Sequence, residues 1–172
     1  MAILRIRTLG DPVLREKARS VERFDRSLRR LVDDMFETMY GAPGVGLAAP
    51  QVGISLRFFV YDDGEGNKGF VADPELSDLE EEDVRDEGCL SIPGPFYLAT
   101  RALRATVTGR DPDGNPVELK GEGLLARIFQ HETDHTNGVL YIDRLPDEGR
   151  REVMRMLREH DLKRAQERST TL

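Results

Sequence analysis

The segment Leu124–Thr136, LLARIFQHETDHT, decides the fold and carries the most distinctive chemistry of the chain. Its spacing predicts a helix, which ends at Asn137 and Gly138 because glycine readily adopts the left-handed conformation. The first half of the segment, as far as Phe129, is apolar on nearly every side. A helix of that kind is surrounded by protein, so we expect it to lie in the core.

His131 and His135 are four positions apart, so their side chains lie on one face of this helix, about 6 Å apart at Cβ. Both imidazoles can therefore bind one metal ion. Glu132 lies about 100° further round, where it can reach a metal-bound water but is badly placed to be a ligand. A carboxylate in that position suits proton transfer from the water to a leaving amine. Two solvated histidines on a surface helix are the alternative, and the apolar residues before them fit it poorly.

A catalytic metal site usually has three protein ligands and one open position, so a third ligand is needed. A third histidine at the metzincin spacing is excluded, because Tyr141 occupies that position. Glu152 or Glu159 could serve, as in a small gluzincin-type metallopeptidase. The other candidate is Cys89, the only thiol, in a segment of glycines and prolines that suits an exposed turn beside a cleft. A nucleophilic Cys89 with a histidine partner leaves the histidine pair unexplained.

The rest of the chain predicts an α+β fold, with short antiparallel strands around a central buried helix and other helices outside it. The expected elements are strands over residues 3–6, 56–61, 70–72, 102–109 and 117–119, and helices over residues 12–18, 28–39 and 150–166. The acidic tract Asp78–Asp86 is expected to be a solvated loop. Neither a repeat nor a linker interrupts the pattern, so residues 1–172 are expected to form a single domain.

Length and composition narrow the class of protein. The 172 residues carry a formal net charge of −7, which argues against binding DNA through bulk charge. A single cysteine excludes an intramolecular disulfide, and no apolar run is long enough to span a bilayer. The N-terminal stretch lacks the apolar region of a signal peptide. We therefore expect a cytoplasmic protein without membrane contact, monomeric by default.

The small-residue segment Gly44–Gly53, GVGLAAPQVG, lacks the lysine and the strand-to-helix arrangement of a phosphate-binding loop. A tight turn is its simplest interpretation. The functional alternative is that Gly44 and Gly46 leave the backbone open. An extended peptide could then add as a strand near Val45–Gly46 and Glu87–Gly88.

Three segments together resemble the motifs of the peptide deformylase family. They are Gly44–Gln51, GVGLAAPQ; Glu87–Ser91, EGCLS; and Gln130–His135, QHETDH. Their order and spacing also fit the family, and the resemblance covers essentially the whole chain. It implies an enzyme that removes formate from the N-terminal formyl-methionine of newly synthesised bacterial-type polypeptides.

The resemblance implies a metal centre held by Cys89, His131 and His135, with water as the fourth ligand and Glu132 as the general acid and base. Fe²⁺ is the metal implied in the cell, with Ni²⁺, Co²⁺ or Zn²⁺ able to substitute. The usual affinity series favours zinc over ferrous iron, so iron occupancy would reflect supply. A thiolate ligand of ferrous iron also predicts sensitivity to oxygen.

The resemblance further implies how the substrate is held. The side-chain amide of Gln51 and the backbone N–H of Leu90 would donate hydrogen bonds to the oxyanion formed at the formyl carbon. The resemblance also implies an apolar pocket for the methionine side chain, and we expect Leu124 and Ile128 to help to form it beside the His131 ring. A Leu and an Ile on a buried helix are core residues by default, which is the competing interpretation of these two.

Two positions depart from the habit of the family. Thr136 stands where leucine commonly follows the second histidine, and Asp73 stands where asparagine is usual. Neither position is a ligand in the family. We expect looser packing near the metal around Thr136.

The C-terminal region differs in charge from the acidic remainder of the chain. From Arg144 to Leu172 there are eight Arg or Lys against six Asp or Glu. A surface helix with many salt bridges is the simplest interpretation. The resemblance adds the hypothesis of ribosome contact, because deformylases of similar build dock through a basic C-terminal helix. A catalytically inactive relative that binds nascent chains is the non-enzyme alternative, weakened by the presence of Glu132 and Gln51.

Overall fold

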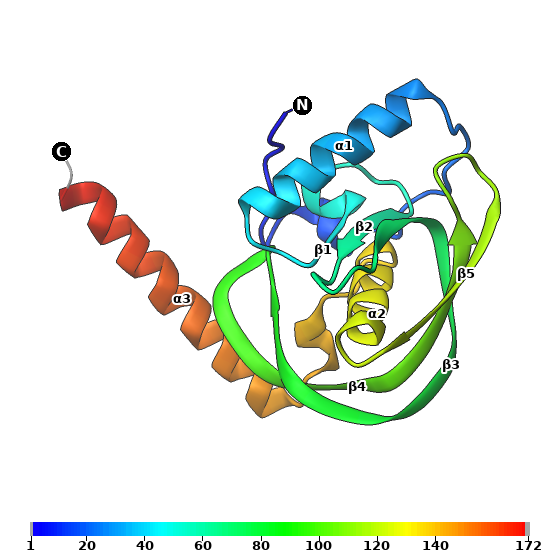
Figure 1. Ribbon diagram of the computed structural model, residues 1–172. Coiled ribbons are helices and arrows are strands. Elements are labelled where there is room, and N and C mark those ends of the chain that lie inside the picture. Colours follow the sequence, from blue (N-terminus) through cyan, green and yellow to red (C-terminus); the bar gives the residue numbers. More distant parts are fainter. Residues whose placement is uncertain (1, 171–172) are drawn as a thin grey trace.

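The computed structural model describes residues 2–170 and confirms the predicted mixture of helices and antiparallel sheet. Helices α1, α2 and α3 span Arg26–Gly41, Leu124–Thr136 and Asp147–Thr170, and the 3-10 helices η1, η2 and η3 span Pro12–Arg15, Ala49–Val52 and Tyr141–Arg144. Strands β1 to β5 span Gly46–Ala48, Phe58–Asp62, Lys68–Cys89, Ile92–Arg110 and Pro116–Glu122. These strands form one antiparallel sheet in the order β1-β2-β3-β4-β5, and β3 and β4 curve around α2 (Figure 1).

Strands β3 and β4 are much longer than the short strands expected from the sequence. Their pairing shifts register at three places, and positive φ angles of 50° and 49° occur at Asp73 and Asp78, beside the first two shifts. Asp is among the few residues other than glycine that tolerate this conformation. Bulges of this kind bend a strand and increase its twist, which lets the β3–β4 hairpin wrap around a helix.

The expectation of a solvated loop over Asp78–Asp86 is wrong, because the tract belongs to β3. Most of its side chains are exposed to solvent, as expected, but its backbone is paired with β4. Opposite charges on the partner strand support this pairing, since Arg104 of β4 contacts Glu80 and Glu81. Cross-strand pairing therefore outweighs the low intrinsic strand preference of acidic residues.

Helix α1 closes the core on the side of β1 and β2. It begins at Asp25, whose carboxylate accepts hydrogen bonds from the backbone N–H groups of Ser27 and Leu28. Its buried face packs with strand residues into one cluster, which includes Leu28, Val32, Met35, Met39, Leu47, Phe58 and Val60. A second cluster joins α2 to the sheet through Phe59, Tyr61, Val71, Val107, Ile128 and Phe129. Helix α2 is buried from Ala126 to Thr136 and ends before Gly138, whose φ is 74°.

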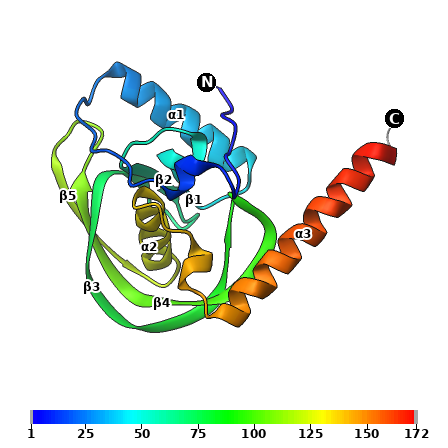
Figure 2. The ribbon, with the colours of Figure 1, turned by 180° about the vertical axis from the view of Figure 1, so that it is seen from behind.

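The two ends of the described chain differ from the sequence expectations. Residues 3–6 form neither helix nor strand, although the neighbouring Arg7 N–H donates to the Gln51 carbonyl at 2.7 Å. The expected helix over 12–18 is only the short η1, which is capped by Asp11. Helix α3 is longer than expected, and Figure 2 shows it extending from the rest of the molecule. None of the helices within residues 2–170 has the length and apolar character needed to cross a bilayer.

Candidate metal centre

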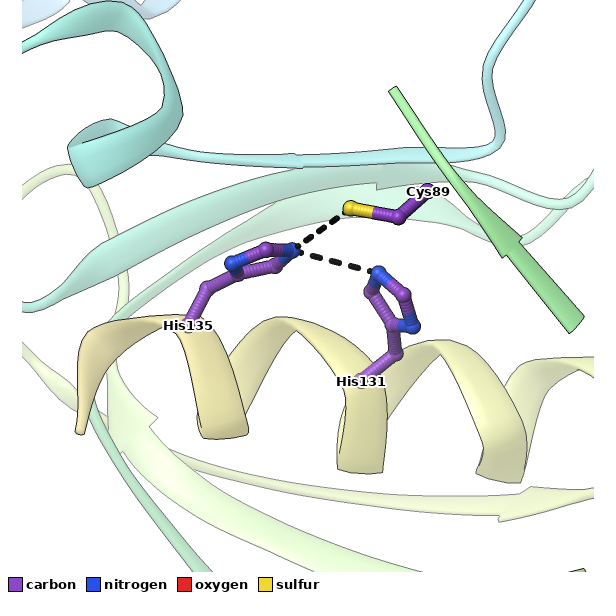
Figure 3. A group of neighbouring side chains, drawn as sticks. All are labelled: Cys89, His131 and His135. Atoms are coloured by element: carbon purple, nitrogen blue, oxygen red, sulfur yellow. Dashed lines mark hydrogen bonds between the residues drawn. The ribbon is translucent and has the colours of Figure 1, made fainter. Parts of the chain in front are cut away.

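Three potential metal ligands meet between the end of β3 and the C-terminal half of α2. The ligand atoms of Cys89, His131 and His135 all lie within 4.8 Å of one another (Figure 3). Cys89 Sγ lies 3.3 Å from His135 Nε2, and the Nε2 atoms of the two histidines are 3.2 Å apart. In a tetrahedral site with ordinary bond lengths, sulfur–nitrogen and nitrogen–nitrogen edges are about 3.6 Å and 3.4 Å. The three donors therefore fit a single divalent ion.

Cys89 is the last residue of β3 and pairs with Ile92 across the turn at Leu90 and Ser91. The sequence predicted an exposed turn, whereas the thiol is only partly exposed. The reason is that the β3–β4 pairing continues up to the turn itself. This hairpin end carries the sulfur over the face of α2 that presents both histidines (Figure 3).

The Glu87 carboxylate orients His131. Glu87 Oε1 lies 2.6 Å from His131 Nδ1, and the same carboxylate accepts hydrogen bonds from Arg101 and Arg127 at 2.7 Å. A carboxylate on one ring nitrogen fixes the orientation of a histidine and leaves the other nitrogen for a metal. Although burial alone would raise it, hydrogen bonds from His131 and Arg101 hold the pKa of the Glu87 carboxyl well below its ordinary value. Glu87 therefore stays ionised.

Glu132 lies on α2 between the two histidines in sequence and is 4% exposed. Burial raises the pKa of its carboxyl to about 7. Its Oε2 has no hydrogen-bond partner among the described residues. Gly46 makes room for this side chain, because a Cβ at that position would lie 2.4 Å from Glu132 Oε1. A buried carboxyl with a pKa near neutrality can both accept and return a proton.

The amide of Gln51 is fixed so that its nitrogen faces the cluster. Gln51 Oε1 accepts a hydrogen bond of 2.9 Å from the Ala48 N–H. The opposite end, Nε2, lies 3.2 Å from Ser91 Oγ and 3.6 Å from Cys89 Sγ. Leu90 is partly buried, and its side chain packs against the α1 cluster. An N–H donor of Gln51 is thus held beside the sulfur.

A cavity of about 590 Å³ opens onto these groups. It is lined by every predicted site residue except His135, namely Val45, Gly46, Gln51, Glu87, Gly88, Cys89, Leu90, Leu124, Ile128, His131 and Glu132. Ile128 is buried in its wall, whereas Leu124 is exposed. Phe96 also lines the cavity and is 66% exposed, with its ring directly against Gly88.

Comparison with known proteins assigns the family. The model of the polypeptide deformylase family matches residues 3–151. The chain belongs to the polypeptide deformylase family. Members of this family are metalloenzymes, and this chain brings together a Cys/His/His group able to hold a metal.

Individual deformylases are similar to this chain over most of their length. A peptide deformylase of Acidothermus cellulolyticus is 55% identical over 159 residues, which cover 92% of this chain and 88% of that protein. One from Thermotoga maritima is 51% identical over 142 residues, covering 82% of this chain and 86% of that protein. The crystal structure of a peptide deformylase from Legionella pneumophila superposes with a TM-score of 0.90 at 44% identity, covering 95% of this chain and 98% of that one.

The glutamates considered as third ligands of a gluzincin-type site lie elsewhere. Glu152 and Glu159 are on α3, where both contact Arg155. The group of potential ligands around the two histidines includes Cys89 and neither of these glutamates. Together with membership of the deformylase family, this arrangement does not favour the metallopeptidase alternative.

The two departures from the habit of the deformylase family are accommodated differently. Thr136 is fully buried, and its hydroxyl donates to the Thr133 carbonyl at 2.8 Å. Asp73 takes the positive φ noted above, while its carboxylate accepts a hydrogen bond of 3.1 Å from the Val21 N–H and contacts Arg110. Looser packing near the metal around Thr136 stays a prediction.

Sequence reasoning missed three contributors to the site. It considered only the backbone of Glu87, whereas the carboxylate holds His131. It gave no role to Arg101, whose three hydrogen bonds link Glu87 to Asp134, or to Phe96 at the cavity. The sequence offered one sign of the role of Glu87, which is its charge directly before Gly88 and Cys89. Its hydrogen-bond partners are 14 to 44 positions away, so the local sequence does not reveal them.

Proposed function

We infer that this protein is a metal-dependent hydrolase that removes the formyl group from the N-terminal formyl-methionine of newly synthesised polypeptides and releases formate. One observation carries this inference. In a chain of the polypeptide deformylase family, three potential metal ligands converge beside a buried carboxyl group at a cavity of about 590 Å³. The segment His131–His135 of α2, HETDH, is then the central catalytic element of the fold.

We propose that Cys89, His131 and His135 hold a divalent metal ion, Fe²⁺ in the cell, with Ni²⁺, Co²⁺ or Zn²⁺ able to substitute. Distances of 3.2 Å and 3.3 Å between the donor atoms support this set. When bound, the ion would act as a Lewis acid and lower the pKa of a water ligand.

Glu132 is proposed as the general acid and base. It accepts a proton from the attacking water and then donates it to the amine that leaves as the new N-terminus. The pKa of about 7 supports both steps, since the two protonation states are then populated near neutral pH. Gly46 leaves the space that the carboxyl group occupies, since a Cβ there would overlap with Glu132 Oε1.

Two donors are proposed for the oxyanion that forms on the formyl oxygen, the side-chain amide of Gln51 and the backbone N–H of Leu90. The Gln51 amide is already held by Ala48, so no reorganisation is needed when negative charge develops. A preorganised donor of this kind lowers the barrier by about 3 kcal/mol.

The substrate is proposed to bind as an added strand beside Val45–Gly46 and Glu87–Gly88, with the methionine side chain in the cavity near Leu124 and Ile128. Strand β1 is an edge strand of the sheet. Its only neighbour among the described strands is β2, so the edge that faces away from β2 is open to a further strand. An extended peptide can pair with such an edge. All of these residues line the same cavity, which supports a common binding site.

We also propose that residues 1–172 act as a single catalytic domain, a cytoplasmic monomer without DNA or membrane contact. Contact with the ribosome is proposed through α3, which extends from the body of the molecule (Figure 2). The negative net charge of −7 supports the absence of DNA binding, and the excess of basic residues after Arg144 supports the ribosome contact.

The experiment that tests the function is release of formate from formyl-Met-Ala-Ser by protein prepared without oxygen and loaded with Fe²⁺ or Ni²⁺. We expect formate from the wild-type protein and a large loss in Glu132→Gln at equal metal content. Acetyl-Met-Ala-Ser is the substrate control. A metal-loaded wild-type protein that releases no formate would contradict the proposed function.

A further inference from the structure

A row of alternating charges connects the molecular surface to His131. It begins at Arg144 on η3, whose Nε and Nη2 donate to the two oxygens of Asp134 at 3.1 Å and 2.7 Å. Asp134 Oδ2 also accepts a hydrogen bond of 2.7 Å from Arg101 Nη1. The remaining nitrogens of Arg101 donate to both oxygens of Glu87, which lies 2.6 Å from His131 Nδ1.

The members of this row differ in exposure. Arg101, Glu87 and Asp134 are 7%, 5% and 5% exposed, whereas the side chain of Arg144 is 51% exposed. The first three are buried, and the row reaches solvent at Arg144. It is also the only member contributed by an element outside α2 and the β3–β4 hairpin.

Asp134 depends on Arg144 for its orientation. Among residues 2–170, the fork of Arg144 is the only contact that engages both carboxylate oxygens of Asp134, because Arg101 reaches Oδ2 alone. A forked contact fixes the plane of a carboxylate, which a single hydrogen bond does not. Fixing that plane aims Oδ2 at Arg101 Nη1. The guanidinium is rigid, so its other two nitrogens are then fixed on Glu87.

We propose that Arg144 is a positioning residue of the metal centre, acting through Asp134, Arg101 and Glu87 to hold the His131 ring in its ligating orientation. This inference rests on the proposed metal centre, but it adds a residue that lies outside all three sequence motifs. Partners of this kind behind a metal ligand typically contribute 10-fold to 100-fold to metal affinity. Because Arg144 acts at a distance, we expect an effect near the lower end of that range.

The test is the Co²⁺ dissociation constant, measured by chelator competition in Arg144→Ala, Arg144→Lys and Arg104→Ala. Arg104 is the matched control, since its Nε and Nη2 also donate to carboxylates, those of Glu80 and Glu81, at the solvent-exposed side of β4. We expect Arg144→Ala to weaken Co²⁺ binding about tenfold and to change the Co²⁺ absorption spectrum. Lysine cannot form the fork, so Arg144→Lys should recover only part of the affinity.

Urea unfolding of the metal-free variants separates this role from a structural one. A loss of stability in Arg144→Ala with unchanged Co²⁺ affinity would overturn the proposal, as would an equal loss of affinity in Arg104→Ala. The Co²⁺ measurement does not depend on turnover. If the Arg144 variants behave as expected while the wild-type protein releases no formate, the proposed function fails and the positioning role stands.

Discussion

The polar side of α2 and helix α3 are both rich in charge, and they use it in opposite ways. Beside α2, Glu87, Arg101 and Asp134 are almost completely buried, and each contacts at least two partners. On α3, Arg155 contacts Glu152 and Glu159 while all three side chains are 39% to 54% exposed. The first set joins residues far apart in the sequence, whereas the second joins neighbours on one helix.

The difference shows that burial decides what a charged residue contributes. An exposed pair is screened by water and salt and adds little to stability. A buried charge has lost its hydration and must be matched by partners in fixed positions. The same requirement fixes the orientation of every group in contact with it, including the His131 ring. Rigid placement of the His131 ring is therefore a consequence of the buried network.

The largest expected effect on activity is that of Glu132→Gln. The substitution keeps the size of the side chain but removes its ability to transfer a proton, so formate release should fall by about 10² to 10⁴. Formate release and metal content measured on the same preparation check this result. A variant with wild-type turnover would mean that another group transfers the proton.

The buried network is broken most directly by Arg101→Met. This change leaves Glu87 and Asp134 without the guanidinium between them, and removal of one partner of a buried pair costs about 3–5 kcal/mol. Urea unfolding of the metal-free protein measures the loss. If the free energy of unfolding stays within error of the wild type, the buried charges beside α2 contribute no more to stability than the exposed charges of α3.

A smaller effect is expected for Gly46→Ala. The added Cβ would lie 2.4 Å from Glu132 Oε1, so the carboxyl group must move. Overpacking of this kind costs about 1–3 kcal/mol, and displacement of Glu132 should also lower formate release. Gly41→Ala is the matched control, since a Cβ at that position would have its nearest contact 3.5 Å away. Equal activity in the two variants would contradict the expected crowding.

The smallest effect is expected on α3. Arg155→Ala removes the contacts with Glu152 and Glu159, yet the melting temperature should change by no more than about 2 °C because these groups are exposed. Calorimetry at low and high salt measures the shift. If Arg155→Ala lowered the melting temperature as much as Arg101→Met does, exposed and buried charges would contribute equally to stability.

Much of the fold was predictable because local rules govern it. Helix α1 follows from the apolar spacing over residues 28–39, and the end of α2 follows from Asn137 and Gly138. The acidic part of β3 was not predictable, because its strand conformation depends on pairing with β4, in which Arg104 offsets two negative charges. A run of acidic residues does not by itself indicate that a partner strand with basic residues will pair with it.

The candidate site shows the same division. The spacing of His131 and His135 on one helix predicts their convergence, and the cavity brings Cys89 and Gln51 to the same place. The carboxylate role of Glu87 was missed, since it exists only when strands and helix are assembled. The reacting side chains can thus be predicted from sequence motifs, whereas the hydrogen-bond network that orients them forms only in the packed structure.

Binding of one metal ion by Cys89, His131 and His135 together underlies every role proposed for this site. Its most direct test is anaerobic titration of the metal-free protein with Co²⁺, followed by absorption spectroscopy, for the wild type and Cys89→Ser. We predict one tightly bound Co²⁺ in the wild type, with a thiolate-to-metal charge-transfer band that disappears in Cys89→Ser. A wild-type protein that binds Co²⁺ without this band, and with the same affinity as Cys89→Ser, would show that the sulfur is not a ligand.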